Sequence, residues 1–234
     1  MVYSPNTYKN DYNDDYQSRG TWINFLMANP IGSEENPQSG GLGLPIDLTL
    51  AFHTDAGVTT DDSVIGTLAI YSTGADSGKF PDGTSRMASR DFSDIIQTQV
   101  VEDIRKIFDP KWTRRGIWDR PYSEARKPNV PGMLLELLSH QNLADQQYGL
   151  DPRFRFEVSR AVYKGILKYL SYVENRDYVV QPVPVTNFAI IPLSGKTIRL
   201  SWEPGIDKIE PTSKPDKYLI YKRIGENGFD NGVI

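Results

Sequence analysis

With 234 residues and a net charge of −4, the chain is long enough for one domain and part of a second, and it has no basic surface that would indicate nucleic acid as a partner. Cysteine is absent, which excludes disulfides, thiolate zinc sites and cysteine nucleophiles but leaves the compartment open. No apolar run is long enough to cross a bilayer, and the N-terminus shows no signal-peptide pattern.

The N-terminal region is polar and tyrosine-rich, and its first predicted element is a short helix. From about Tyr16 the apolar residues, among them Trp22 and Phe25, have the spacing of an amphipathic helix. Residues 29–43 hold prolines and glycines among polar residues, which is typical of a loop. We therefore expect a surface loop directly before the first strand.

The central region predicts strands and helices in alternation. Residues 45–53 alternate like a buried strand, and residues 66–72 predict a second strand between two turns. A helix is expected over residues 91–108, because apolar side chains recur there at helical spacing.

The next part of the chain repeats this order. Residues 117–118 predict a short strand, and residues 130–142 a strongly apolar one. Residues 142–149 predict a loop, and a helix that opens with a proline is expected over residues 151–172. The sequence thus predicts an α/β domain with a twisted sheet and flanking helices.

Four arginines lie in the irregular segment that precedes the strand at 130–142. Guanidinium groups pair with carboxylates and phosphates, so this segment could bind an acidic ligand. A solvated basic loop is the alternative, and it is the commoner role of such a run. The residues are Arg114, Arg115, Arg120 and Arg126.

The chain changes class at a linker, residues 177–184, which holds two prolines. Beyond it, residues 185–191, 197–202 and 218–222 alternate as strands between turn signals. This pattern predicts the opening of an all-β sandwich. Because a two-sheet sandwich needs about seven strands, the domain expected over residues 185–234 is truncated.

Two polar residues stand out within apolar strands. His53 ends the first strand, and Glu136 lies among methionine and leucine residues. A lone histidine at a strand end is more often structural than a metal ligand, because a metal site needs several convergent ligands. Burying Glu136 costs several kcal/mol unless the carboxyl is paired or protonated, which favours a functional role. Together the two residues suggest a metal ligand and its general base.

The motifs resemble those of the zinc-dependent N-acetylmuramoyl-L-alanine amidases. AFHTDAG resembles the family's strand that ends in a zinc histidine, and PGMLLEL resembles the strand that carries its catalytic glutamate. The resemblance covers residues 10–172. Further residues that resemble the family's motifs are Arg19, Asn24, Gly66, Tyr71, Arg126, Asn142 and Asp145.

For residues 1–176 the resemblance implies a reaction and a cofactor. The reaction is zinc-dependent hydrolysis of the amide bond between N-acetylmuramic acid and L-alanine in peptidoglycan. The resemblance implies that His53 is a zinc ligand and Glu136 the catalytic carboxylate. It also implies that Arg126 and Asp55 bind substrate.

The resemblance has a gap at its N-terminal end. The family's two other zinc ligands, a histidine in a Gly-His-Gly-Gly loop and a glutamate on the following helix, have no counterpart, and neither has its first strand. We therefore expect a partial catalytic domain that is inactive as given. Residues 185–234 resemble the start of a fibronectin type III domain, as in multidomain surface proteins labelled xanthan lyase or golvesin-like.

The resemblance also implies partners and a location. It implies peptidoglycan or a muropeptide as substrate, further domains of a longer parent protein, and a place in the bacterial cell envelope, either the periplasm or the cell surface. A rival hypothesis is a non-catalytic surface or wall-binding module. In that case the amidase-like fold only presents loops, and the fibronectin-like segment acts as a spacer.

Overall fold

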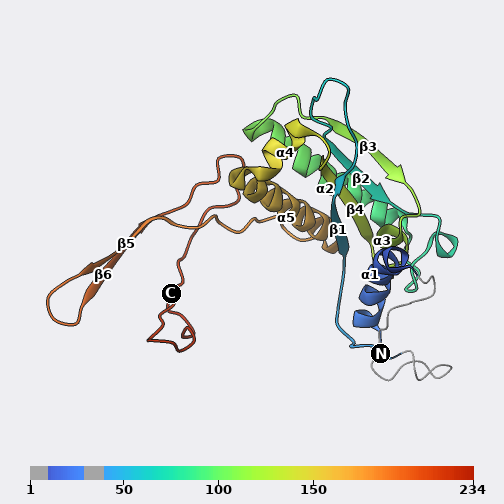
Figure 1. The fold of residues 1–234 in the computed structure, drawn as a ribbon. Coiled ribbons are helices and arrows are strands. Elements are labelled where there is room, and N and C mark those ends of the chain that lie inside the picture. The colour runs from blue at the N-terminus through green and yellow to red at the C-terminus, as the bar shows by residue number, and fades with distance from the viewer. Residues whose placement is uncertain (1–9, 29–39) are drawn as a thin grey trace. The chain divides into compact units, whose positions relative to one another are not determined.

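The computed structural model describes residues 10–28 and 40–234. Its internal contacts divide the chain into two units, Met1–Glu174 and Asn175–Ile234. The first unit contains a sheet with helices on both faces, so the predicted α/β fold with flanking helices is confirmed (Figure 1).

The sheet of the first unit has the strand order β1-β4-β2-β3. Strand β1 runs parallel to β4, β2 runs parallel to β3, and β2 is antiparallel to β4. Strand β4 is therefore internal, and seven of its eight residues are buried, which explains its almost continuous apolar sequence. The strands are β1 (Thr49–Asp55), β2 (Thr67–Tyr71), β3 (Arg114–Asp119) and β4 (Gly132–Ser139).

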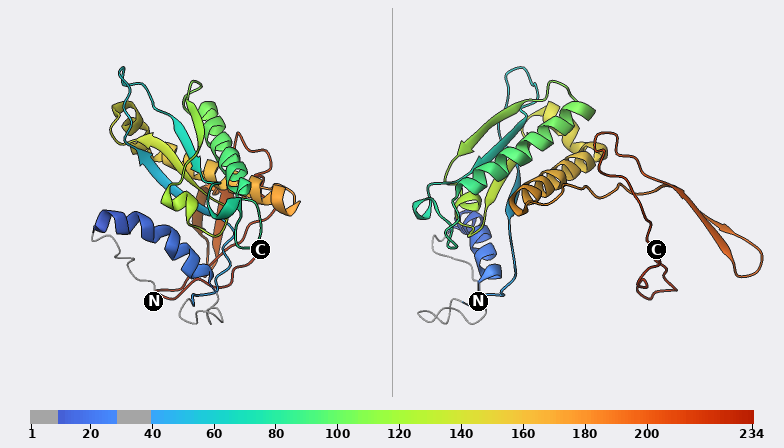
Figure 2. Two further views of the ribbon diagram at one scale, coloured as in Figure 1. Left: turned by 90° about the vertical axis from the view of Figure 1, so that its right-hand side faces the viewer. Right: turned by 180° about the vertical axis from the view of Figure 1, so that it is seen from behind.

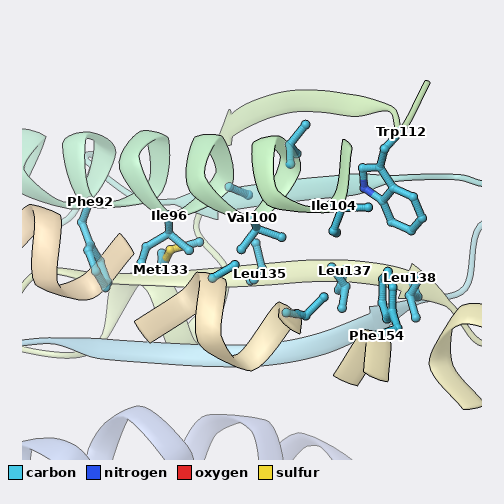
Figure 3. Close-up of a cluster of buried hydrophobic side chains, with 14 of the residues drawn as sticks. Phe92, Ile96, Val100, Ile104, Trp112, Met133, Leu135, Leu137, Leu138 and Phe154 are labelled. Atoms are coloured by element: carbon cyan, nitrogen blue, oxygen red, sulfur yellow. The ribbon is translucent and has the colours of Figure 1, made fainter. Parts of the chain in front are cut away.

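One face of this sheet is covered by two long helices, α2 (Met87–Ile107) and α5 (Pro152–Glu174) (Figure 2). Apolar side chains of α2 at helical spacing meet alternate side chains of β4 and the first turns of α5 (Figure 3). Each such side chain contributes about 1.5–3 kcal/mol when fully buried. The layer includes Phe92, Ile96, Val100, Ile104, Met133, Leu135, Leu137, Phe154 and Val158.

The opposite face carries a smaller apolar cluster and two other helices, α1 (Asp11–Met27) and α3 (Ser123–Arg126). Asn24 holds α1 against the segment after α3. Its amide nitrogen donates to the carbonyl of Lys127 (2.8 Å), and its amide oxygen accepts from the backbone N–H of Asn129 (2.8 Å). The alternation of β1 and β4 directs every second side chain toward this less covered face.

Several element boundaries differ from the predictions for local reasons. Helix α1 begins at Asp11 rather than near Tyr16, because the Asn10 side chain caps its first turn. Helix α2 begins at Met87 rather than at residue 91, and β1 spans Thr49–Asp55 rather than 45–53. The short strand expected at 117–118 extends over the six residues of β3. Most of the loop predicted at 29–43 lies outside the described residues.

The prediction of a loop at 142–149 is wrong, because these residues form most of a helix, α4 (Leu143–Leu150). Asn142 caps it by accepting a hydrogen bond from the backbone N–H of Asp145 (3.0 Å). Asp145, itself fully buried, accepts from the N–H groups of Ser139 and Ile65. Burial raises the pKa of Asp145, and these two backbone hydrogen bonds oppose that rise.

Replacing Asn142 with alanine should destabilise the first unit by about 1–2 kcal/mol, the usual cost of a lost N-cap. A further loss is expected because its amide group donates to Thr59 Oγ1 and to the Ser63 carbonyl, which ties down the β1–β2 connection. Urea unfolding would measure the change. Asn142→Asp, which keeps the cap but loses the amide donor, should recover part of it; equal losses in the two variants would contradict the capping role.

The second unit contains the antiparallel pair β5 (Thr186–Pro192) and β6 (Ile198–Glu203). The third strand predicted at 218–222 is wrong: Ile220 forms only an isolated bridge with Val233. Alternating sequence alone does not make a strand when no neighbouring strand is in register. Trp202 packs edge-on against the ring of Tyr218, with 5.3 Å between the centroids.

Over residues 10–28 and 40–234, no helix combines the length and apolar composition needed to cross a membrane.

Candidate active site

A cleft of about 820 Å³ lies on the sheet face that carries α1 and α3. Its lining comes from one side of α1, the C-terminal end of β1, the middle of β4 and residues 120–126, which lead into α3. Four segments from different parts of the chain therefore meet there. Each of the four site residues expected from the sequence lines this cleft: His53, Asp55, Arg126 and Glu136.

His53 and Glu136 are directly paired in the parallel register of β1 and β4. Paired residues of adjacent strands project to the same face of a sheet. Leu135 and Leu137 pack into the layer under α2 and α5, so Glu136 between them points to the opposite face, into the cleft. The structure thus brings the predicted histidine and glutamate together.

The carboxyl group of Glu136 has one buried oxygen, Oε2, that the described residues leave without a hydrogen bond. Burial raises the pKa of Glu136, and the nearby His53 only partly offsets the rise. A carboxyl in this state holds a proton more readily than an exposed one, as a group that takes up and returns a proton must.

Glu124, in α3, is a cleft residue that sequence reasoning missed. Its Oε1 atom lies 3.0 Å from His53 Nε2 and accepts a hydrogen bond of 2.8 Å from Arg19 Nη1. The hydrogen bond to Glu124 raises the pKa of His53. Burial would raise the pKa of Glu124, but its bonds to His53 and Arg19 outweigh this and lower it. Glu124 therefore fixes the orientation of the imidazole.

Asp55 lines the cleft, but much of its hydrogen-bonding capacity is already used. Oδ2 accepts from Arg115 Nη1 (2.6 Å), and Oδ1 accepts from the N–H groups of Ala56 (2.6 Å) and Gly57 (3.1 Å). Burial raises its pKa, yet the bonds to Arg115 and the backbone lower it overall. Asp55 thus organises the turn that follows β1, and its contact with a substrate stays a prediction.

Arg126 ends α3 with its side chain exposed at the cleft. Its carbonyl accepts a hydrogen bond of 3.1 Å from Nη1 of Arg86, a guanidinium that is fully buried. Arg86 is itself held by Asp76 Oδ2 (2.6 Å) and stacks on the ring of Phe80. The position of Arg126 is therefore fixed through its backbone, while its guanidinium stays available.

A complete zinc site is not formed by the residues that the structure describes. They contain no group of three or more histidine, aspartate or glutamate side chains arranged to hold a metal ion. Catalytic zinc takes three protein ligands. His53 and Glu124 supply a nitrogen and an oxygen donor that are mutually hydrogen-bonded, and this pair alone does not meet that requirement.

The family model described as N-acetylmuramoyl-L-alanine amidase matches residues 43–168, which is more than half of the chain. The chain belongs to this amidase family. The match includes His53, Asp55, Glu124, Arg126 and Glu136, whereas α1 precedes it.

Solved amidase structures are similar over part of their length. An N-acetylmuramoyl-L-alanine amidase of Clostridium difficile 630 is 20% identical, with 53% of this chain and 58% of that chain covered and a TM-score of 0.42. The CwlD amidase of Clostridioides difficile, solved in complex with the GerS lipoprotein, is 20% identical, with coverage of 71% and 66% and a TM-score of 0.47. The chain therefore spans less than two thirds of either structure. No curated protein matches it.

Proposed function

We propose that the cleft is the hydrolytic site of a peptidoglycan amidase that cleaves the amide bond between N-acetylmuramic acid and L-alanine. Membership of the amidase family supports this reaction class. The observation that carries the proposal is the direct pairing of His53 with Glu136 across β1 and β4, together with the buried, unpartnered oxygen of Glu136. Peptidoglycan as the substrate would place the parent protein in the cell envelope.

In this proposal Glu136 moves a proton twice. It accepts a proton from the water that attacks the scissile carbonyl carbon, and it returns that proton to the nitrogen as the C–N bond breaks, so that an amine and a carboxylic acid result. The raised pKa of Glu136 favours both steps. Glu124 orients His53, and Arg126 and Asp55 face the substrate.

The cofactor proposed for this reaction is zinc, which when bound supplies Lewis-acid polarisation of the carbonyl. His53 is the one ligand that we assign. The other ligands are not present as a preformed group in the described residues, and no step above depends on the metal.

We expect His53→Ala to lose zinc and hydrolysis together. The full-length parent protein and its variant would be incubated with zinc, passed through gel filtration and assayed for metal content and for muropeptide cleavage. His140, the second of the two histidines, is a matched control because it also lines the cleft and its Nδ1 lies 3.2 Å from Thr54 Oγ1. His140→Ala should keep the zinc content and the muropeptide cleavage of the unsubstituted protein. A full-length parent protein that neither keeps zinc nor cleaves muropeptide would reject the amidase proposal.

The rival function is a non-catalytic wall-binding module, and one observation favours it: the described residues hold no set of three metal donors. Incubation with purified peptidoglycan sacculi separates the two. A wall-binding module should sediment with sacculi and release no soluble muropeptide at any zinc concentration. Residues 185–234 resemble the start of a fibronectin type III domain, and we propose that they act as a spacer under either function.

A further inference from the structure

Two arginines at the cleft have no acidic partner among the described residues. Of the three arginines that line it, Arg19 is bonded to Asp15 and Glu124. Among the described residues, the guanidinium of Arg120 donates only to the carbonyl of its neighbour Asp119 (2.9 Å), and Arg126 forms no salt bridge. Two guanidinium groups therefore remain available at one side of the cleft.

The acidic side chains of the same cleft do not compete for them. Asp55 is paired with Arg115 on the β1 side, and Glu124 is bonded to Arg19 and His53. Glu136 is the exception, because no salt bridge to it is formed by the described residues, but its unpaired oxygen is buried at the sheet. An incoming anion would meet two uncompensated cations before it reached the sheet.

Both arginines project from a backbone that is held in place. The N–H of Arg120 donates to the carbonyl of Tyr71 (2.9 Å), and Asp119 before it accepts from Thr73 N (3.0 Å). Pro121 then stiffens the turn into α3. Arg126, one short helix further on, is anchored by the buried Arg86. Their spacing is set by the fold, which lowers the entropic cost of closing both on one ligand.

We propose that Arg120 and Arg126 form an anion subsite that recognises a carboxylate on the peptide part of the substrate. The planar guanidinium group pairs with a carboxylate through two parallel hydrogen bonds, which gives direction as well as strength. This inference rests on the proposed function for the identity of the substrate. The inference adds Arg120 to the proposed substrate-binding residues and specifies the group that they bind. The enzyme would select an acidic stem peptide over a neutral one.

The test measures binding without hydrolysis. The full chain is titrated calorimetrically with a muramoyl dipeptide that carries a free side-chain carboxylate and with the same compound as its amide. We expect the acid to bind about tenfold more tightly, which corresponds to about 1.4 kcal/mol. Arg120→Gln should remove most of this preference by weakening only the acid, and Arg120→Lys should restore part of it. Raising the salt concentration should reduce the preference in the wild type.

Arg155→Gln is the matched control, since Arg155 is an exposed arginine on α5, which covers the other sheet face. It should keep the full preference. Equal affinity of wild type for acid and amide, including no binding of either, would overturn the subsite, as would equal losses for both ligands in Arg120→Gln. N-acetylmuramic acid, whose carboxylate lies on the lactyl group, should show no dependence on Arg120; if it does, the peptide assignment is wrong. A preference without any hydrolysis would leave the subsite standing while the amidase proposal fails.

Discussion

In the full-length parent protein, Glu136→Gln should reduce muropeptide hydrolysis by about 10²–10⁴-fold, the usual contribution of a general acid–base group. Glutamine has nearly the same shape and can still occupy the same place in the cleft, but it cannot accept a proton from water. An uncharged amide also costs less to bury without a partner than an ionised carboxylate does, so the free energy of unfolding should stay equal or rise. Zinc content should not fall, because the proton carrier is not assigned as a ligand.

The combination of readouts separates a catalytic role from a structural one. Muropeptide release would be followed by chromatography, stability by urea unfolding, and metal by elemental analysis, all on the same preparation and with zinc supplied. Glu102→Gln on α2, an exposed glutamate under the opposite sheet face, should leave all three unchanged. Hydrolysis that survives in Glu136→Gln would show that the carboxyl is structural.

The strands and long helices of the first unit follow from sequence periodicity, because their apolar faces are continuous. The face of the sheet toward which each side chain points also follows, since alternation fixes it. The pairing register of β1 and β4 cannot be predicted from periodicity. His53 and Glu136 are far apart in sequence, and only the order of motifs shared with a family suggested that they meet. The structure supplies the pairing that makes the two residues one site.

Glu124 could not have been found in the same way. It lies in a helix of four residues, which is too short to show a period, and its partners His53 and Arg19 are 71 and 105 residues away. Helix α4 was missed for a related reason, because a helix of eight residues carries a weak apolar pattern and its clearest signal is the cap at Asn142. Short elements that depend on caps and tertiary contacts are where pattern reasoning fails.

Lys164→Met should destabilise the first unit by about 3–5 kcal/mol, the cost of leaving a buried charge without its partner. Lys164 Nζ lies 2.6 Å from Asp103 Oδ2 between α5 and α2, and the two side chains are only 1% and 3% exposed. The other oxygen of Asp103 is already buried without a hydrogen bond in the described residues. Removing the ammonium would leave the whole carboxylate uncompensated. Urea unfolding, followed by a probe in the first unit, measures the loss.

The double variant Asp103→Leu/Lys164→Met decides why the loss occurs. If the cost of the single variant is an unpaired buried charge, replacing both groups with apolar side chains of similar size should recover most of it, because neither desolvation penalty remains. Arg153→Met is the control: its side chain is 84% exposed and pairs with Asp151 at 3.1 Å, so the change should stay below about 1 kcal/mol. If the double variant is as unstable as the sum of the losses measured for Lys164→Met and for Asp103→Leu alone, packing between α2 and α5, rather than charge, accounts for the effect.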